Sequence, residues 1–127
     1  EFALESLNVR HIVVCGHSDC GAMRALSHNP KAAGNTPMSN WLRHAKAAAE
    51  GDFADLNVLS KRNVSAQLDN LRSHPLARER ENAGKLKLHG LWFNIRNAEV
   101  YYLEKPPQDF VLIDDAEGEK ILARLGE

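Results

Sequence analysis

The sequence predicts an α/β fold with a mostly parallel central sheet flanked by helices. A short apolar run over residues 11–15 is rich in β-branched residues and ends at Gly16, a pattern typical of a strand that is buried on both faces. Helix-forming segments separate this run from further strand-like segments, and such alternation defines the α/β class. The chain has 127 residues with 43% hydrophobic content, which is enough for the packed core of one domain.

The N-terminal elements follow from the spacing of apolar residues. Residues 1–8 are expected to form the end of an amphipathic helix. Its apolar residues lie broadly on one side: Phe2, Leu4 and Leu7. A turn follows the strand over 11–15, and either Ser18 or Asp19 can cap the short helix expected after that turn.

Two longer helices are expected in the middle of the chain. Residues 29–36 contain proline, glycine and asparagine, so they are expected to form a loop. Pro37 can occupy the first turn of a helix that continues to about Ala49. The next helix covers about residues 56–73, and Pro75 stops it.

The C-terminal third is expected to contain three strands and a helix. Residues 86–95 and 99–103 have strand-like composition and are separated by a short polar segment, so we expect them to form a hairpin. Pro106-Pro107 interrupts the chain, residues 110–113 form a last short strand, and residues 117–125 form a terminal helix.

Charge and cysteine content exclude several classes of protein. Lys and Arg number 16 against 17 Asp and Glu, which gives a net charge of −1 and argues against a nucleic-acid-binding surface and a polybasic membrane tether. No apolar run approaches the roughly 18 residues of a membrane span. Two cysteines are too few for a disulfide scaffold, so we expect a reducing, cytoplasmic location. Cys15 lies inside the first strand and is expected to be a small buried hydrophobe.

The segment over residues 16–21, Gly-His-Ser-Asp-Cys-Gly, carries the chemistry. His17 and Cys20 can point to one spot at the carboxyl end of the strand, where open α/β sheets bind ligands. Imidazole and thiolate are both zinc ligands, and the N–H of Gly21 near a helix start can bind an anion. Two residues do not complete a tetrahedral site. Spacing alone therefore leaves open a metal site, a reactive Cys20 and a structural turn.

This segment resembles the second zinc-ligand motif of the β-class carbonic anhydrases, in which a buried strand leads into G-H-[ST]-x-C-G. Further matches follow in the family's order: Asn40-Trp41-Leu42, the helix motif over 63–71, His74-Pro75 and the strand motif over 88–95. The resemblance covers about residues 1–113. It implies Zn²⁺ as cofactor, His17 and Cys20 as ligands, and a contact from the Gly21 N–H to substrate or bicarbonate.

Two departures from the family pattern limit what the chain can contribute. The family's C-x-D-x-R motif, which supplies a third ligand and an Asp-Arg dyad, does not occur in the sequence, so we expect no catalytic dyad residue in this chain. We expect the missing motif to lie before Glu1, so that residues 1–127 form the C-terminal part of one catalytic domain. We therefore expect the isolated chain to be inactive. Phe93 replaces a Tyr that contributes to bicarbonate inhibition in some members, so we expect no such regulation through this residue.

The resemblance implies the reversible hydration of CO₂ to bicarbonate by zinc-bound hydroxide, in an intact protein that forms a homodimer or a higher homo-oligomer. It is compatible with a cytoplasmic, organellar or microcompartment location. Two alternatives are a CS₂ or COS hydrolase on the same zinc fold and a non-catalytic module derived from the family. Outside the motif, His89 is expected to have a hydrogen-bonded structural role.

Overall fold

The computed structural model describes residues 1–28 and 36–126. The helices are α1 (Phe2–Glu5), α2 (Gly21–His28), α3 (Pro37–Leu42), the 3-10 helix η1 (Arg43–Ala49), α4 (Leu56–Ser73), α5 (Pro75–Asn82) and α6 (Asp115–Leu125). The strands are β1 (His11–His17), β2 (Lys87–Asn94), β3 (Glu99–Lys105) and β4 (Asp109–Leu112). Residues 29–35 of the expected loop lie outside the described part.

The strands form one sheet in the order β1-β2-β3-β4. β1 pairs with β2 in parallel, from His11 opposite Lys87 to His17 opposite Phe93, whereas β2–β3 and β3–β4 are antiparallel. The α/β class is therefore confirmed, but the expectation of a mostly parallel sheet is wrong for the described residues. Short connections join the last three strands and force antiparallel pairing, while the helices between β1 and β2 provide the long crossover that a parallel pair requires.

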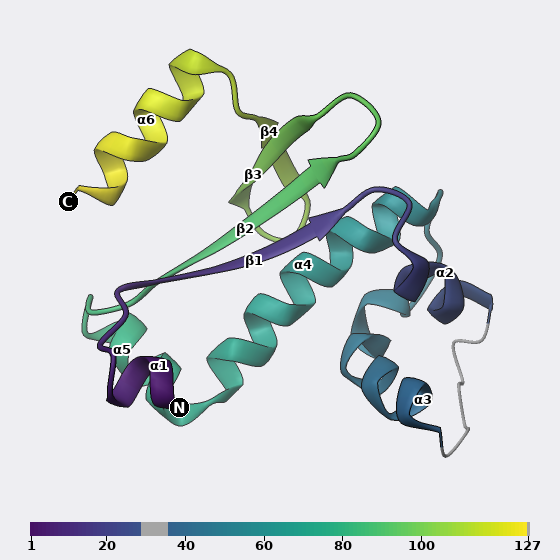
Figure 1. The fold of residues 1–127 in the computed structure, drawn as a ribbon, viewed down its shortest axis with the longest axis horizontal. Coiled ribbons are helices and arrows are strands. Elements are labelled where there is room, and N and C mark those ends of the chain that lie inside the picture. The colour runs from purple at the N-terminus through teal and green to yellow at the C-terminus, as the bar shows by residue number, and fades with distance from the viewer. Residues whose placement is uncertain (29–35, 127) are drawn as a thin grey trace.

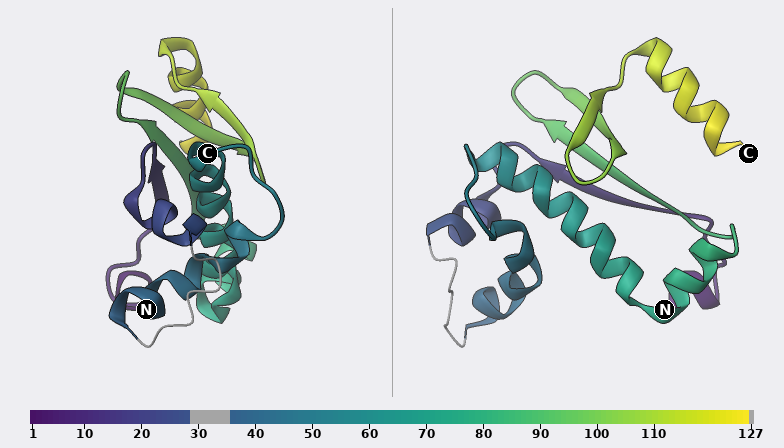
Figure 2. Two further views of the ribbon diagram at one scale, coloured as in Figure 1. Left: turned by 90° about the vertical axis from the view of Figure 1, so that its right-hand side faces the viewer. Right: turned by 180° about the vertical axis from the view of Figure 1, so that it is seen from behind.

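The helix α4 runs along β1 and β2, with α2 and α3 to one side of it and α1 and α5 near its C-terminal end (Figures 1 and 2). Its bounds agree with the prediction, because Asp55 caps its first turn by accepting from Asn57 N at 2.8 Å and Pro75 begins the next helix. Leu59, Val64 and Leu68 form its buried apolar side. None of the described helices is long and apolar enough to cross a membrane.

Two glycines allow α4 to lie close to the sheet. A Cβ atom on Gly16 would lie 2.6 Å from Val64 Cγ2, and one on Gly90 would lie 3.0 Å from Val64 Cγ1. Such distances are well inside normal carbon–carbon contact. The absence of a side chain at both positions therefore sets how closely the helix and the two strands approach.

The core divides into two clusters at opposite ends of α4. Residues of α2, η1 and α4 form the first: Met23, Leu26, Ala45, Ala48 and Leu59. The second joins α1 to α5 through Leu4, Ala77 and Leu86.

The helix α1 is shorter than the helix predicted over residues 1–8, since Asn8 adopts a left-handed φ of 53°. Of the apolar residues predicted to lie on one side of this helix, only Leu4 is buried.

The prediction that β1 is buried on both faces is wrong in the described structure, and so is the burial of Cys15. Val13 is 52% exposed and Cys15 is an exposed free thiol. β1 lies at an edge of the described sheet, and α4 contacts the face on which Gly16 lies. Because side chains alternate along a strand, Val13 and Cys15 point to the opposite face.

The C-terminal predictions are close to the structure, whereas the helix predicted over 37–49 is divided. Thr36 and Ser39 form a capping box at the start of α3, but after Leu42 the chain continues as the 3-10 helix η1. β2 and β3 form the predicted hairpin. α6 begins two residues earlier than predicted, because the Asp114 side chain accepts from Glu117 N at 2.8 Å and caps it.

A chain of three polar rings crosses the first strands on the face away from α4. His89, which is 8% exposed, places its Nε2 3.1 Å from His11 Nδ1 and its Nδ1 3.2 Å from the Tyr102 hydroxyl. Burial lowers the pKa of His89, and the charges of His11 and Lys87 lower this pKa further. These contacts agree with the structural role predicted for His89.

We predict that replacing Gly16 by Ala lowers the free energy of unfolding by about 1–3 kcal/mol, because the new methyl group overpacks the contact with Val64. Urea unfolding measures this change. Gly118→Ala is the matched control, since its Cβ would lie 3.7 Å from the nearest side-chain atom, Ile113 Cγ2, and alanine favours the helix. Equal stabilities for the two variants would contradict the proposed close approach.

We also predict that the chain loses stability in mild acid through His89. The unfolded chain protonates this imidazole near its ordinary pKa of 6.5, and the folded chain protonates it only at lower pH. This contribution to the free energy of unfolding is therefore complete above pH 6.5 and declines as the pH falls toward the folded pKa.

Urea unfolding at about pH 7.5 and at about pH 5.5 tests this dependence. His89→Gln should flatten the slope between the two pH values, and His74→Gln, at an exposed histidine before α5, should preserve it. A slope that survives His89→Gln would assign the acid sensitivity to other groups.

Candidate metal centre

The predicted ligands lie on either side of a tight turn. His17 is the last residue of β1, and Cys20 precedes α2, whose first turn includes the bond from Arg24 N to Cys20 O at 3.0 Å. Between them Asp19 adopts a left-handed φ of 52°, which reverses the chain direction. The turn therefore connects a strand end to a helix start with both predicted donors at its limits.

The structure defines the tautomer of His17. Its Nδ1 lies 2.8 Å from Ser18 O, and because a carbonyl oxygen can only accept, Nδ1 carries the proton and donates it. In neutral imidazole the other nitrogen, Nε2, then holds a lone pair. A metal-binding histidine typically donates its second ring nitrogen to such an acceptor, so His17 has a form that can bind a metal through Nε2.

Ser18 connects the turn to the end of β2. Its side chain is buried, its N–H donates to Phe93 O at 2.9 Å, and its hydroxyl accepts from Ile95 N at 2.9 Å. Because α2 begins at Gly21, neither Ser18 nor Asp19 occupies the position before the helix. The predicted capping role is therefore wrong, and Ser18 instead extends the contact between β1 and β2.

A second buried serine, Ser60 of α4, reaches the same turn. Its hydroxyl donates to His17 O at 2.8 Å and accepts from Trp92 Nε1 at 3.1 Å. Spacing along the sequence could not identify Ser18 or Ser60 as supporting residues, because their partners are 77 and 43 positions away.

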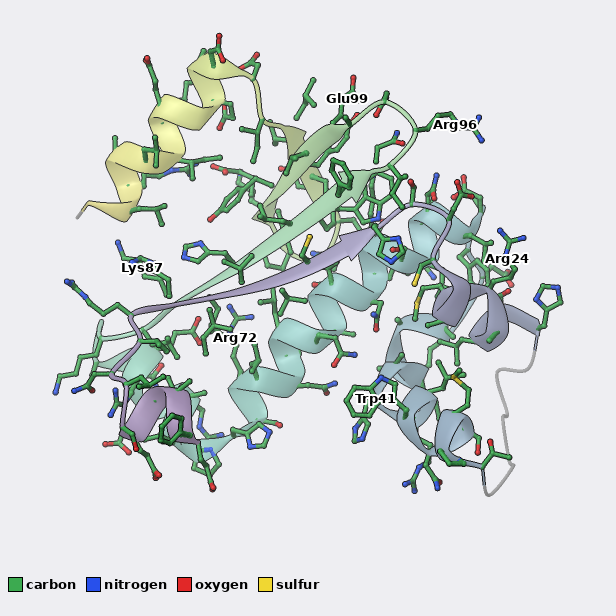
Figure 3. The ribbon with its side chains drawn as sticks, in the orientation of Figure 1. Arg24, Trp41, Arg72, Lys87, Arg96 and Glu99 are labelled. Atoms are coloured by element: carbon green, nitrogen blue, oxygen red, sulfur yellow. The ribbon has the colours of Figure 1, made fainter. Side chains whose placement is uncertain are left out.

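Cys20 lines an open groove of about 740 Å³ between β1, α3 and α4. Trp41 of α3 also lines it and lies on the side of α3 that faces α4 (Figure 3). Gln67 and Asn70 of the predicted α4 motif donate to His44 O at 2.8 and 3.1 Å. These motif residues therefore connect α4 to η1 and fix one wall of the groove.

Gly21 opens α2 and is exposed. Apart from its chain neighbours and the backbone of its own helix, no heavy atom of the described residues lies within 4 Å of the place that a Cβ would take. A small ligand can therefore approach this part of the backbone, but the role predicted for its N–H stays a prediction.

The donor set matches part of a zinc site. His17 offers a neutral nitrogen, and Cys20 is a partly buried free thiol, the donor types that zinc prefers. Within residues 1–28 and 36–126, no group of three or more His, Cys, Asp and Glu side chains could hold a metal ion. The assignment of both residues as ligands therefore stays a prediction, and a closed tetrahedral site would need further donors.

Residues 1–100 match the sequence model of the carbonic anhydrase family. The structure is similar to that of the β-carbonic anhydrase CcaA, with a TM-score of 0.76 and 33% identity over 89% of this chain and 60% of that chain. The chain belongs to the β-carbonic anhydrase family. A carbonic anhydrase from Pseudomonas aeruginosa is 37% identical over 135 residues, which cover 100% of this chain and 60% of that protein.

Tetrameric β-carbonic anhydrases from Sordaria macrospora share the fold at a TM-score of 0.61 and 26% identity, over 83% of this chain and 57% of that chain. This chain thus spans 57–60% of the length of these three relatives. The family resemblance predicted from the motifs is confirmed, and the matched residues include the turn that carries His17 and Cys20.

Proposed function

We propose that this chain carries the His-Cys half of the zinc site of a β-carbonic anhydrase, and that the intact protein catalyses the reversible hydration of CO₂ to bicarbonate. One observation carries the proposal. The turn that aligns with the family holds His17 with Nδ1 donating to Ser18 O, which leaves Nε2 for a metal, three residues before the free thiol of Cys20.

Each residue has a separate part in this proposal. Zinc, when bound, supplies a Lewis acid that lowers the pKa of water toward neutrality. His17 provides a neutral nitrogen and Cys20 an anionic sulfur, and the N–H of Gly21 donates to an oxygen of the substrate or of bicarbonate. A third protein ligand and the Asp-Arg dyad come from a part of the catalytic domain outside residues 1–127.

The relatives described above are named carbonic anhydrases, which supports CO₂ over CS₂ or COS as the substrate and an enzyme over a non-catalytic module. We also propose that the intact protein is a cytoplasmic homo-oligomer. The tetrameric state of the Sordaria macrospora relatives supports association, and exposed apolar side chains of α3, Met38 at 60% and Trp41 at 75%, are available for contacts between subunits.

A cobalt titration tests the ligand assignment. Cobalt replaces zinc as the probe because a thiolate ligand gives Co²⁺ a charge-transfer absorption. We expect the chain to bind Co²⁺ weakly with this band, Cys20→Ser to remove the band, and His17→Ala to lower the affinity. Cys15→Ser is the matched control and should retain the band; its loss in this variant alone would contradict the assignment.

Stopped-flow CO₂ hydration tests the activity. The 127-residue chain should give no rate above buffer, because it lacks one ligand and the dyad. The same chain extended to include a C-x-D-x-R segment should give a zinc-dependent rate. A zinc-loaded extended protein without CO₂ hydration would refute the proposed reaction.

A further inference from the structure

The hydroxyl of Ser60 joins three elements at the position of the predicted histidine ligand. Ser60 lies in α4 and is 3% exposed, and Trp92 of β2 is 2% exposed. The hydroxyl donates to His17 O at 2.8 Å and accepts the Trp92 Nε1 proton at 3.1 Å. A serine hydroxyl has a single proton, so its donation is committed to the carbonyl of His17.

The peptide between His17 and Ser18 is consequently held from two sides. Its oxygen accepts from Ser60 on α4, and its N–H donates to Phe93 O on β2 at 2.9 Å. The next carbonyl, Ser18 O, accepts the Nδ1 proton of the His17 ring at 2.8 Å. Ser18 O belongs to the following peptide, so fixing the His17–Ser18 peptide helps to place the acceptor of the ring.

Ser60 reaches the strand because Gly16 has no side chain. A Cβ atom on Gly16 would lie 2.6 Å from Val64 Cγ2, 3.3 Å from Trp92 Cδ1 and 3.4 Å from Ser60 O. Any larger residue would push α4 away from the strand end and lengthen the bond from Ser60 to His17. The ammonium group of Lys61 lies 4.4 Å from the centre of the Trp92 ring and helps to hold the indole in place.

We propose that Ser60 is a positioning residue for the metal ligand His17. By fixing the His17–Ser18 peptide, the Ser60 hydroxyl keeps the ring in the tautomer that protonates Nδ1 and leaves Nε2 free to bind metal. The purpose of this role, metal binding by His17, rests on the proposed function. The tautomer itself can be observed in the chain without any metal.

The main test is ¹⁵N NMR of the His17 ring in the metal-free chain, above the ordinary pKa of imidazole, at about pH 8.5. The unaltered chain should show mainly the Nδ1-protonated form. Ser60→Ala should raise the population of the Nε2-protonated form several-fold, because His17 O loses its donor and the peptide can rotate. Ser65→Ala removes another buried hydroxyl of α4 and should leave the tautomer unchanged.

Two further variants distinguish an effect on the His17 tautomer from a general loss of stability. Ser60→Cys keeps the side chain close in size but replaces the hydroxyl by a weak donor, so it should change the tautomer in the same direction while the chain stays folded. Ser60→Thr retains the hydroxyl and should restore the unaltered spectrum. If Ser60→Ala and Ser60→Cys alter stability but leave the His17 tautomer unchanged, Ser60 has only a structural role and the proposal is overturned.

A Co²⁺ titration separates this proposal from the proposed function. Loss of an outer-shell partner typically weakens metal binding by about 10–100-fold. We expect Ser60→Ala to weaken Co²⁺ binding by a factor that approaches this range, and Ser65→Ala to leave Co²⁺ binding unchanged. A chain whose tautomer responds to Ser60 but which binds no Co²⁺ would support the positioning role and count against the metal site. Equal Co²⁺ affinity in the unaltered chain and Ser60→Ala would count against the positioning role alone.

Discussion

Val64 of α4 packs between Gly16 of β1 and Gly90 of β2, and the remaining contacts of the helix with the sheet depend on this close approach. A methyl group at either glycine would separate the layers, because protein interiors have little free volume. With the layers in contact, Trp92 is buried beneath α4. The same separation allows the Ser60 hydroxyl to reach the backbone of β1.

The turn that carries the predicted ligands, His17 and Cys20, illustrates how backbone groups can determine side-chain chemistry. The ring of His17 is oriented by a main-chain carbonyl, and that carbonyl follows a peptide held by α4 and β2. A main-chain carbonyl carries no net charge and does not titrate, so the acceptor for the Nδ1 proton of His17 is not itself altered by pH. The strand end, the helix and the hairpin together therefore prepare one nitrogen atom for a ligand.

The sequence allowed prediction of elements whose signals are local. The bounds of α4 follow from apolar spacing and from Pro75, and the β2–β3 hairpin follows from a short polar connection. Burial of Cys15 could not be predicted in this way, because apolar composition does not report which neighbours cover a strand. The hydrogen-bond partners of Ser18 and Ser60 could not be predicted from the sequence either, since both depend on tertiary contacts between distant segments. A short motif identifies the candidate ligands, but it does not identify the serines that hold the turn in place.

The position of β1 in the sheet has a consequence for how the chain behaves in solution. One long side of this seven-residue strand faces no other strand within the described residues, and its main-chain groups there form a template onto which an extended peptide can add. The opposite edge, β4, has only four residues and begins with Asp109, which makes it a poorer template. In the 127-residue chain by itself, self-association through strand addition should therefore start at β1.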